Sequence, residues 1–172
     1  SYSKTVTRSK LTTNIVSLIK GAINMFSAST KGLLRIQENL DPDCGELPVD
    51  PNELQHVLLN LFRNSYQSLD PDTGFIEVGA QRVIVDQALT LKHITLKEGE
   101  HIKIYVKDNG KGINKEDIEH IFEPFFTTKE IGKGTGLGLS MVHGIITGYG
   151  GVIYVESEVN EGTTFTILLP RV

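Results

Sequence analysis

Four glycines alternate over seven positions in the segment 132–138, which leads directly into an apolar helical pattern. Glycine has no Cβ, so the backbone N–H groups of such a segment can approach a ligand closely. Backbone N–H groups at the start of a helix favour the binding of phosphate. The run therefore indicates a phosphate-binding loop, although a flexible connection without a ligand has the same composition.

Two asparagines, Asn60 and Asn64, lie four residues apart in a strongly helical segment, so their side chains share one side of that helix. They border its apolar face, where the wall of a pocket would be. An Asn side-chain oxygen can ligate a hard cation such as Mg²⁺ without adding charge. Two solvated asparagines would give the same pattern, so the pair alone does not establish a site.

Three further segments carry chemistry-bearing residues. In the segment 108–112, the Asp108 carboxylate follows a predicted strand and could accept a hydrogen bond from an amine, although Asp and Gly also favour ordinary turns. The segment 123–129 places Phe125 and Phe126 before the glycine run, either as a docking or lid surface or as core residues. Thr164 lies in the predicted last hairpin, where a plain β-former would also fit.

Two common nucleotide motifs are excluded. A Walker loop needs Gly-Lys followed by Ser or Thr after a four-residue gap, and the chain contains no such tripeptide. A dinucleotide-binding fingerprint needs a glycine spacing that 132–138 does not supply, and no predicted strand directly precedes it.

The clearest predicted helix starts at Asp50, which is a good N-cap, with Pro51 at the first helical position and Glu53 completing a capping box. Its apolar residues recur at helical spacing. Further helices are predicted over 13–26, 114–122 and 137–149, and strands over 33–36, 76–85, 102–106, 152–155 and 163–169. The polar connection 86–100 carries no prediction. This order favours a mixed sheet with helices on one face.

Composition sets outer bounds on the function. The 172 residues suit one domain, and the net charge of −4 argues against a nucleic-acid partner. The single cysteine, Cys44, excludes an intrachain disulfide and fits a reducing, cytoplasmic compartment. No apolar run approaches the length of a membrane span, and no signal peptide is visible. We expect a linker over 1–12 and one domain over 13–172.

Taken in order, these blocks resemble the ATP-binding catalytic domain of bacterial sensor histidine kinases. The segment 58–65 resembles the family's N box, 108–112 its first glycine box, 122–126 its F box, 132–140 its second glycine box, and 162–165 its last block. The resemblance implies the Bergerat fold, an α/β (α+β) two-layer sandwich. In that fold a mixed, mainly antiparallel sheet of about five strands carries about three main helices on one face. Ser65 stands where the family usually has Ala, and its small size should be tolerated.

The resemblance also implies a role for each block. Asn64 would ligate a Mg²⁺ ion that bridges the triphosphate of ATP, and Asn60 would line the phosphate end. Asp108 would accept from the adenine amino group, with Thr164 near the base, and the segment 130–133 would form part of a lid. The ATP-binding positions that it implies are Asn60, Asn64, Asp108, Gly110, Gly112, Ile113, Thr128, Lys129, Lys133, Gly134, Thr135, Gly136, Leu137, Gly138 and Thr164, and Phe125 and Phe126 would form the docking or lid segment.

Phosphoryl transfer is favoured over hydrolysis, because Asn60 stands where the ATPase branches carry a Glu that activates water. The family's acceptor is a histidine on a separate dimerising hairpin, and none of the five histidines here lies in that setting. The implied partners are therefore an upstream His-containing dimerisation domain and a response regulator. The parent would be a homodimer of the nitrogen-regulation or hybrid-kinase branch, and the isolated domain a monomer. The alternatives are a nucleotide-binding regulatory module without transfer, an ATPase clamp, and a serine kinase that acts on an anti-sigma partner.

Overall fold

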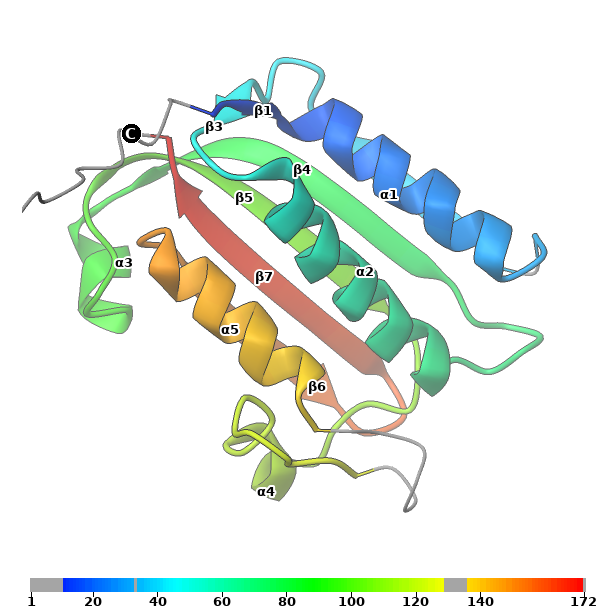
Figure 1. The fold of residues 1–172 in the computed structure, drawn as a ribbon. Coiled ribbons are helices and arrows are strands. Elements are labelled where there is room, and N and C mark those ends of the chain that lie inside the picture. The colour runs from blue at the N-terminus through cyan, green and yellow to red at the C-terminus, as the bar shows by residue number, and fades with distance from the viewer. Residues whose placement is uncertain (1–10, 33, 129–135, 172) are drawn as a thin grey trace, which may run out of the picture.

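The computed structural model describes residues 11–32, 34–128 and 136–171. These residues form two layers, a twisted sheet and a layer of helices (Figure 1). The sheet order is β2-β4-β5-β7-β6, with β2 parallel to β4 and every other neighbouring pair antiparallel. The five strands are β2 (Ile36–Leu40), β4 (Ile76–Val85), β5 (Gly99–Asp108), β6 (Val152–Glu158) and β7 (Gly162–Pro170). The predicted mixed, mainly antiparallel sheet is confirmed.

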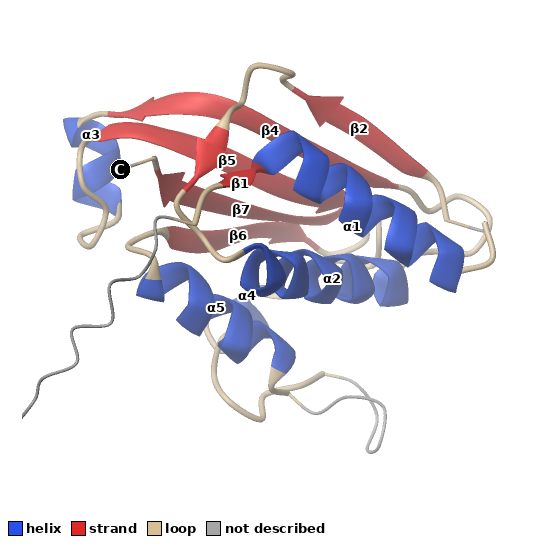
Figure 2. Cartoon of the chain, turned by 45° about the horizontal axis from the view of Figure 1, so that its top comes forward, coloured by secondary structure: helices blue, strands red, loops and turns tan. Residues whose placement is uncertain are grey.

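Three long helices cover one face of this sheet, as Figure 2 shows. They are α1 (Ile15–Ser29), α2 (Pro51–Ser68) and α5 (Gly138–Gly148). Short elements complete the described chain: α3 (Gln87–Lys92), α4 (Lys115–Ile118) and a ribbon of β1 (Thr13–Asn14) with β3 (Glu46–Leu47). No helix in the described part of the chain combines the length and apolar character needed to cross a membrane.

The start of α2 is fixed by its predicted cap but not by the predicted capping box. The Asp50 side chain accepts from the N–H of Asn52 at 2.8 Å, as an N-cap does. In a capping box, Glu53 would accept from the N–H of Asp50. That N–H instead donates to the Tyr149 hydroxyl at 3.0 Å, because Tyr149, just after α5, packs against the start of α2. The two helices are therefore joined where α2 begins and α5 ends.

The apolar face of α2 forms the centre of the core. Leu54, Leu58, Leu61 and Phe62 are each at most 2% exposed. Burying a side chain of this size stabilises a protein by about 1.5–3 kcal/mol. This packing holds α2 over the middle of the sheet, against β5 and β4 (Figure 1).

Several predicted boundaries are wrong by a few residues. The first helix begins at Ile15, not Thr13, because Thr13 pairs with Leu47 in the ribbon. Leu33 lies outside the described residues, and the strand that was predicted to start there starts at Ile36, the partner of Ile76. The connection 86–100 contains α3, and α4 ends at Ile118, well before residue 122.

Candidate functional site

The two asparagines of α2 have their amide nitrogens engaged within the helix. Asn60 Nδ2 donates to the carbonyl of His56 at 2.9 Å, and Asn64 Nδ2 donates to the carbonyl of Asn60 at 3.1 Å. Both side chains are half-buried. Among the described residues, neither Oδ1 atom has a hydrogen-bond partner, so the oxygen of each amide is the atom left to meet a ligand.

The first turn of α5 lies directly against Asn60. A Cβ on Gly138 would come within 2.9 Å of Asn60 Oδ1, so a larger residue there would displace the Asn60 amide from the helix start. Helix α5 begins at Gly138 without a side-chain cap on its first N–H groups. An uncapped helix start attracts anions through its N–H groups and its dipole. Asn60 and Gly138, which the sequence predicts to line the phosphate end, therefore lie next to each other in the structure.

Asp108 ends β5 in a nearly dry position, with only 3% of the residue exposed. Its Oδ1 accepts from the N–H of Gly110 at 2.8 Å and from the N–H of Thr163 at 3.3 Å. Burial raises the pKa of this carboxyl, and the polar groups of Gly110, Ser65, Thr163 and Ser68 around it oppose that rise. The side chain is thus a buried acceptor that the protein backbone holds in one orientation.

The glycines after Asp108 are required by contacts within the protein. A Cβ on Gly110 would overlap the Ser68 side chain, and one on Gly112 would overlap the backbone of Glu158. These contacts explain both glycines without the ATP-binding role that the resemblance implies for them. Ile113 is half-buried, and its N–H donates to Ser157 Oγ at 2.8 Å.

The structure places Thr164 away from Asp108. Successive residues of a strand face opposite sides, and Thr164 lies between Lys107 and Glu156 on the face that the three long helices leave uncovered. There it lines a shallow polar groove of about 400 Å³ together with Tyr105. Thr163, whose N–H reaches Asp108, is the residue of this block that belongs to the site.

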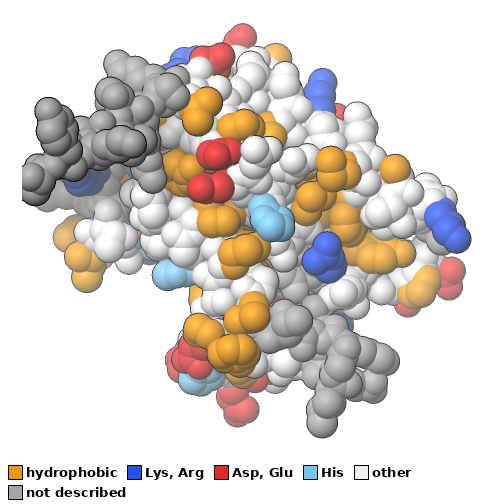
Figure 3. Space-filling model, in the orientation of Figure 1, with side chains coloured by type: hydrophobic (Ala, Val, Ile, Leu, Met, Phe, Trp, Pro, Cys, Tyr) orange, Lys and Arg blue, Asp and Glu red, His pale blue; other side chains and the backbone are white. Residues whose placement is uncertain are grey.

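Phe125 and Phe126 differ in their environments. Phe125 is 74% exposed, has a positive φ of 67°, and donates its N–H to the carbonyl of Gly136 at 2.8 Å. Phe126 is half-buried against the core, with its ring centre 5.8 Å from that of His120. The docking interpretation therefore fits Phe125, and the core interpretation fits Phe126. Figure 3 shows hydrophobic side chains gathered near the start of α5 on the helical face.

The remaining predicted positions fall in two groups. Thr128 and Leu137 are exposed at the two ends of the undescribed segment. Lys129, Lys133, Gly134 and Thr135, with the expected lid over 130–133, lie outside the described residues.

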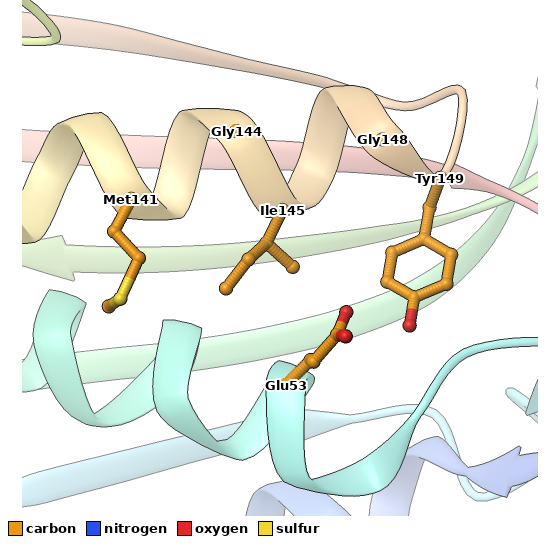
Figure 4. Close-up of a pocket in the computed structure, with 6 residues that line it drawn as sticks. All are labelled: Glu53, Met141, Gly144, Ile145, Gly148 and Tyr149. Carbon is orange, nitrogen blue, oxygen red and sulfur yellow. The ribbon is translucent and has the colours of Figure 1, made fainter.

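A separate cavity of about 440 Å³ lies between α2 and α5, away from the Asn60–Gly138 contact. Figure 4 shows Glu53 and Tyr149 at one end and Met141 at the other. Glu53 and Tyr149 belong to the joint between the start of α2 and the end of α5. The cavity thus has no part in the predicted nucleotide site.

Sequence reasoning gave no binding role to Ser65, Ser68 or Thr163. A signal for the two serines exists in the core-facing stripe of α2, at positions 54, 58, 61, 65 and 68, which changes from leucine to serine at 65. Polar residues at core positions need polar surroundings, and here the Asp108 carboxyl lies near both serines. Thr163 could have been found from the alternation of β7, because it shares the face of the buried Phe165.

Comparison with known proteins agrees with this fold. Residues 49–172 match the family model described as histidine kinase-, DNA gyrase B-, and HSP90-like ATPase. The chain is 45% identical over 129 residues to sensor kinase CckA of Brucella abortus, covering 75% of this chain and 14% of that protein. It is 41% identical over 125 residues to sensor histidine kinase ZraS of Escherichia coli K12, covering 73% of this chain and 23% of that protein. The chain thus spans less than a quarter of either relative.

Among solved structures, the catalytic domain of histidine kinase ThkA, in a nucleotide-free form, superposes with a TM-score of 0.75. Its sequence is 26% identical, and the match covers 94% of this chain and 95% of that one. The likeness therefore extends over the whole two-layer fold.

Proposed function

The chain belongs to the family of histidine kinase-, DNA gyrase B- and HSP90-like ATPases, and from this we propose that it is the catalytic ATP-binding domain of a two-component sensor histidine kinase. It binds Mg-ATP and passes the γ-phosphoryl group to a histidine on a separate dimerisation domain. The contact between Asn60 and the start of α5 carries this proposal, because it pairs an amide oxygen with an uncapped helix start.

The base end of the site supports adenine as the ligand. Asp108 is held by the N–H groups of Gly110 and Thr163, so its remaining oxygen can only accept. A buried acceptor suits the 6-amino group of adenine and opposes the 6-oxo group of guanine. Asp108 ends the central strand β5 near the end of α2, whereas Asn60 lies about two turns earlier in that helix. The spacing allows one nucleotide to reach both ends.

A divalent cation fits the donor set at the phosphate end. Among the described residues, no cluster of His, Cys, Asp or Glu could hold a metal alone. Asn64 Oδ1 offers one neutral oxygen ligand, and Mg²⁺ commonly takes few protein ligands together with phosphates and water. When bound there, the ion would neutralise charge on the phosphate oxygens.

Transfer to a protein acceptor is favoured over hydrolysis by the chemistry of Asn60. An amide is not a base and cannot take a proton from water, whereas phosphoryl transfer needs mainly positioning and charge neutralisation. The role of Asn60 and Gly138 is therefore to orient the phosphates toward an incoming side chain. The exposed Phe125, beside the start of α5, offers an apolar contact for the domain that carries that side chain.

The partners follow from this reaction. The acceptor histidine lies on a dimerisation domain of the parent protein, which would be a homodimer, and a response-regulator aspartate receives the phosphoryl group next. The sensor-kinase relatives support this order. A cytoplasmic location fits the single buried cysteine.

The first test is direct binding. Titration of the domain with a fluorescent ATP analogue, with Mg²⁺ or with EDTA, should give saturable binding that ATP competes away and GTP does not. The second test adds an isolated dimerisation domain of a related kinase and γ-labelled ATP. Label on its histidine supports the kinase function, and ATP binding without any label favours a regulatory module. Steady ATP hydrolysis by the domain alone favours an ATPase.

A further inference from the structure

Three buried side-chain atoms of the described residues lack a hydrogen-bond partner: Ser65 Oγ, His101 Nε2 and Arg171 Nε. Of these, only Ser65 belongs to the candidate site. Ser65 is 1% exposed, and it directly follows Asn64 on α2. A buried hydroxyl without a partner costs about 1–3 kcal/mol, so its presence at a binding site calls for a partner supplied from outside the protein.

The neighbours of Ser65 identify what such a partner must offer. Every hydrogen bond that the described residues make to the Asp108 carboxylate at 3.5 Å or less ends on Oδ1. Ser65 lies close enough to this carboxylate to favour its charged form. Ser68, one turn later, already donates to the carbonyl of Ser65 at 2.8 Å. The free Ser65 hydroxyl and the free Oδ2 of Asp108 are thus two buried polar groups close to each other.

The two groups have different hydrogen-bonding abilities. A carboxylate can only accept, whereas a serine hydroxyl can donate one hydrogen bond and accept others. The base edge of adenine has the complementary pair side by side, a 6-amino donor and the ring acceptor N1. Hypoxanthine and guanine have a 6-oxo acceptor and an N1–H donor. The Asp108 carboxylate, which is itself an acceptor, therefore repels the 6-oxo group of either base.

We propose that Ser65 is a specificity-determining residue, whose hydroxyl serves N1 of adenine, directly or through one buried water, while Asp108 takes the 6-amino group. This assignment rests on the proposed ATP-binding function and extends it to a second recognition point. It also explains why the leucine stripe of α2 changes to serine at the depth of Asp108.

The experiment measures the affinities of the wild-type domain and Ser65→Ala for ATP and for the ATP analogue in which CH replaces N1. Ser65→Ala should weaken ATP binding about three- to tenfold, the usual worth of one hydrogen bond, and leave the analogue's affinity unchanged. Ser29→Ala is the matched control, because its hydroxyl donates to the Phe26 carbonyl on α1, outside the site. The control should alter neither affinity.

The thermal midpoint of the empty domain supplies an independent readout. Ser65→Ala removes an unpaired buried hydroxyl, so the midpoint should stay equal or rise while ATP affinity falls. A fall in the midpoint, an equal loss for both nucleotides, or no loss for ATP would each overturn the assignment. If the wild-type domain binds no ATP, the proposed function and this inference both fail. If the wild type binds ATP but Ser65→Ala changes the affinities for ATP and for the analogue equally, only this inference fails.

Discussion

Replacing Asp108 with asparagine should change base preference while keeping the fold. The Oδ1 atom holds the N–H groups of Gly110 and Thr163 at 2.8 and 3.3 Å. An asparagine can keep both bonds by placing its amide oxygen there, which turns its NH₂ group toward the ligand. Asp108→Ala, in contrast, would leave both amides unpaired and cost about 2–6 kcal/mol of folding stability at about 1–3 kcal/mol each.

The expected loss of ATP affinity follows from the side chain at position 108 and the 6-amino group of adenine that faces it. In Asp108→Asn, the 6-amino group of adenine meets another donor, so one bond to a charged acceptor, about 1.5–3 kcal/mol, is lost. An unpaired donor adds about 1–3 kcal/mol, and the sum lowers ATP affinity roughly a hundredfold or more. Inosine triphosphate, whose 6-oxo group can accept from the new NH₂, should bind the variant better than it binds the wild type.

The assay is competition of each nucleotide against a fluorescent ATP analogue, with urea unfolding to confirm the fold.

The pH dependence of the unfolding free energy is a further check, because burial raises the pKa of Asp108 in the empty domain. A raised pKa means that the folded state holds the proton more tightly than the unfolded chain. The protonated carboxyl therefore contributes stability at low pH that is lost as the pH rises through the raised pKa. Asp108→Asn should lack this dependence. An unchanged ATP-to-inosine-triphosphate ratio in the variant would refute the assignment.

Other substitutions separate the remaining roles. Asn64→Ala should remove the dependence of ATP affinity on Mg²⁺, measured by titration with Mg²⁺ and with EDTA; a retained dependence would exclude Asn64 as the ligand. Gly138→Ala should change the unfolding free energy by less than about 1 kcal/mol, because its Cβ meets only the flexible end of Asn60, yet weaken ATP binding several-fold. Equal affinity would show that this contact does not bear on the phosphates. Glu123, 2.9 Å from His120 Nδ1, raises the pKa of that imidazole, so Glu123→Gln should lower it in an NMR titration, and no change would contradict the pairing.

Local signals in the sequence predicted the elements that hold the site. Asp50 and Pro51 located the start of α2, and the four-residue spacing of Asn60 and Asn64 placed both on one side of it. The alternation of β5 located Asp108 at a strand end. Each of these features depends on neighbours within a few residues, which is why pattern and propensity were sufficient.

Features that depend on contacts between distant segments were missed. The N–H of Asp50 bonds to Tyr149, 99 residues later, and no local rule reveals that the capping box is displaced. The same holds for Gly110, whose need for glycine comes from Ser68 across the structure. The structure places Thr163 beside Asp108 and turns the predicted Thr164 to the other face of the sheet, as the alternation of β7 with the buried Phe165 indicates.

The site is organised by a single helix whose core-facing stripe changes character along its length. At positions 54, 58 and 61 this stripe is leucine and anchors α2 to the sheet. At 65 and 68 it is serine, at the level of Asp108, while Asn60 and Asn64 form the adjoining edge, where Asn60 meets the first turn of α5. Because a helix fixes the distance between these positions, α2 sets the separation of the base end and the phosphate end, and its apolar residues hold both ends in place on the sheet. A change that shifts α2 along the sheet should therefore impair both ends together, whereas changes at Ser65 or Gly138 should impair one.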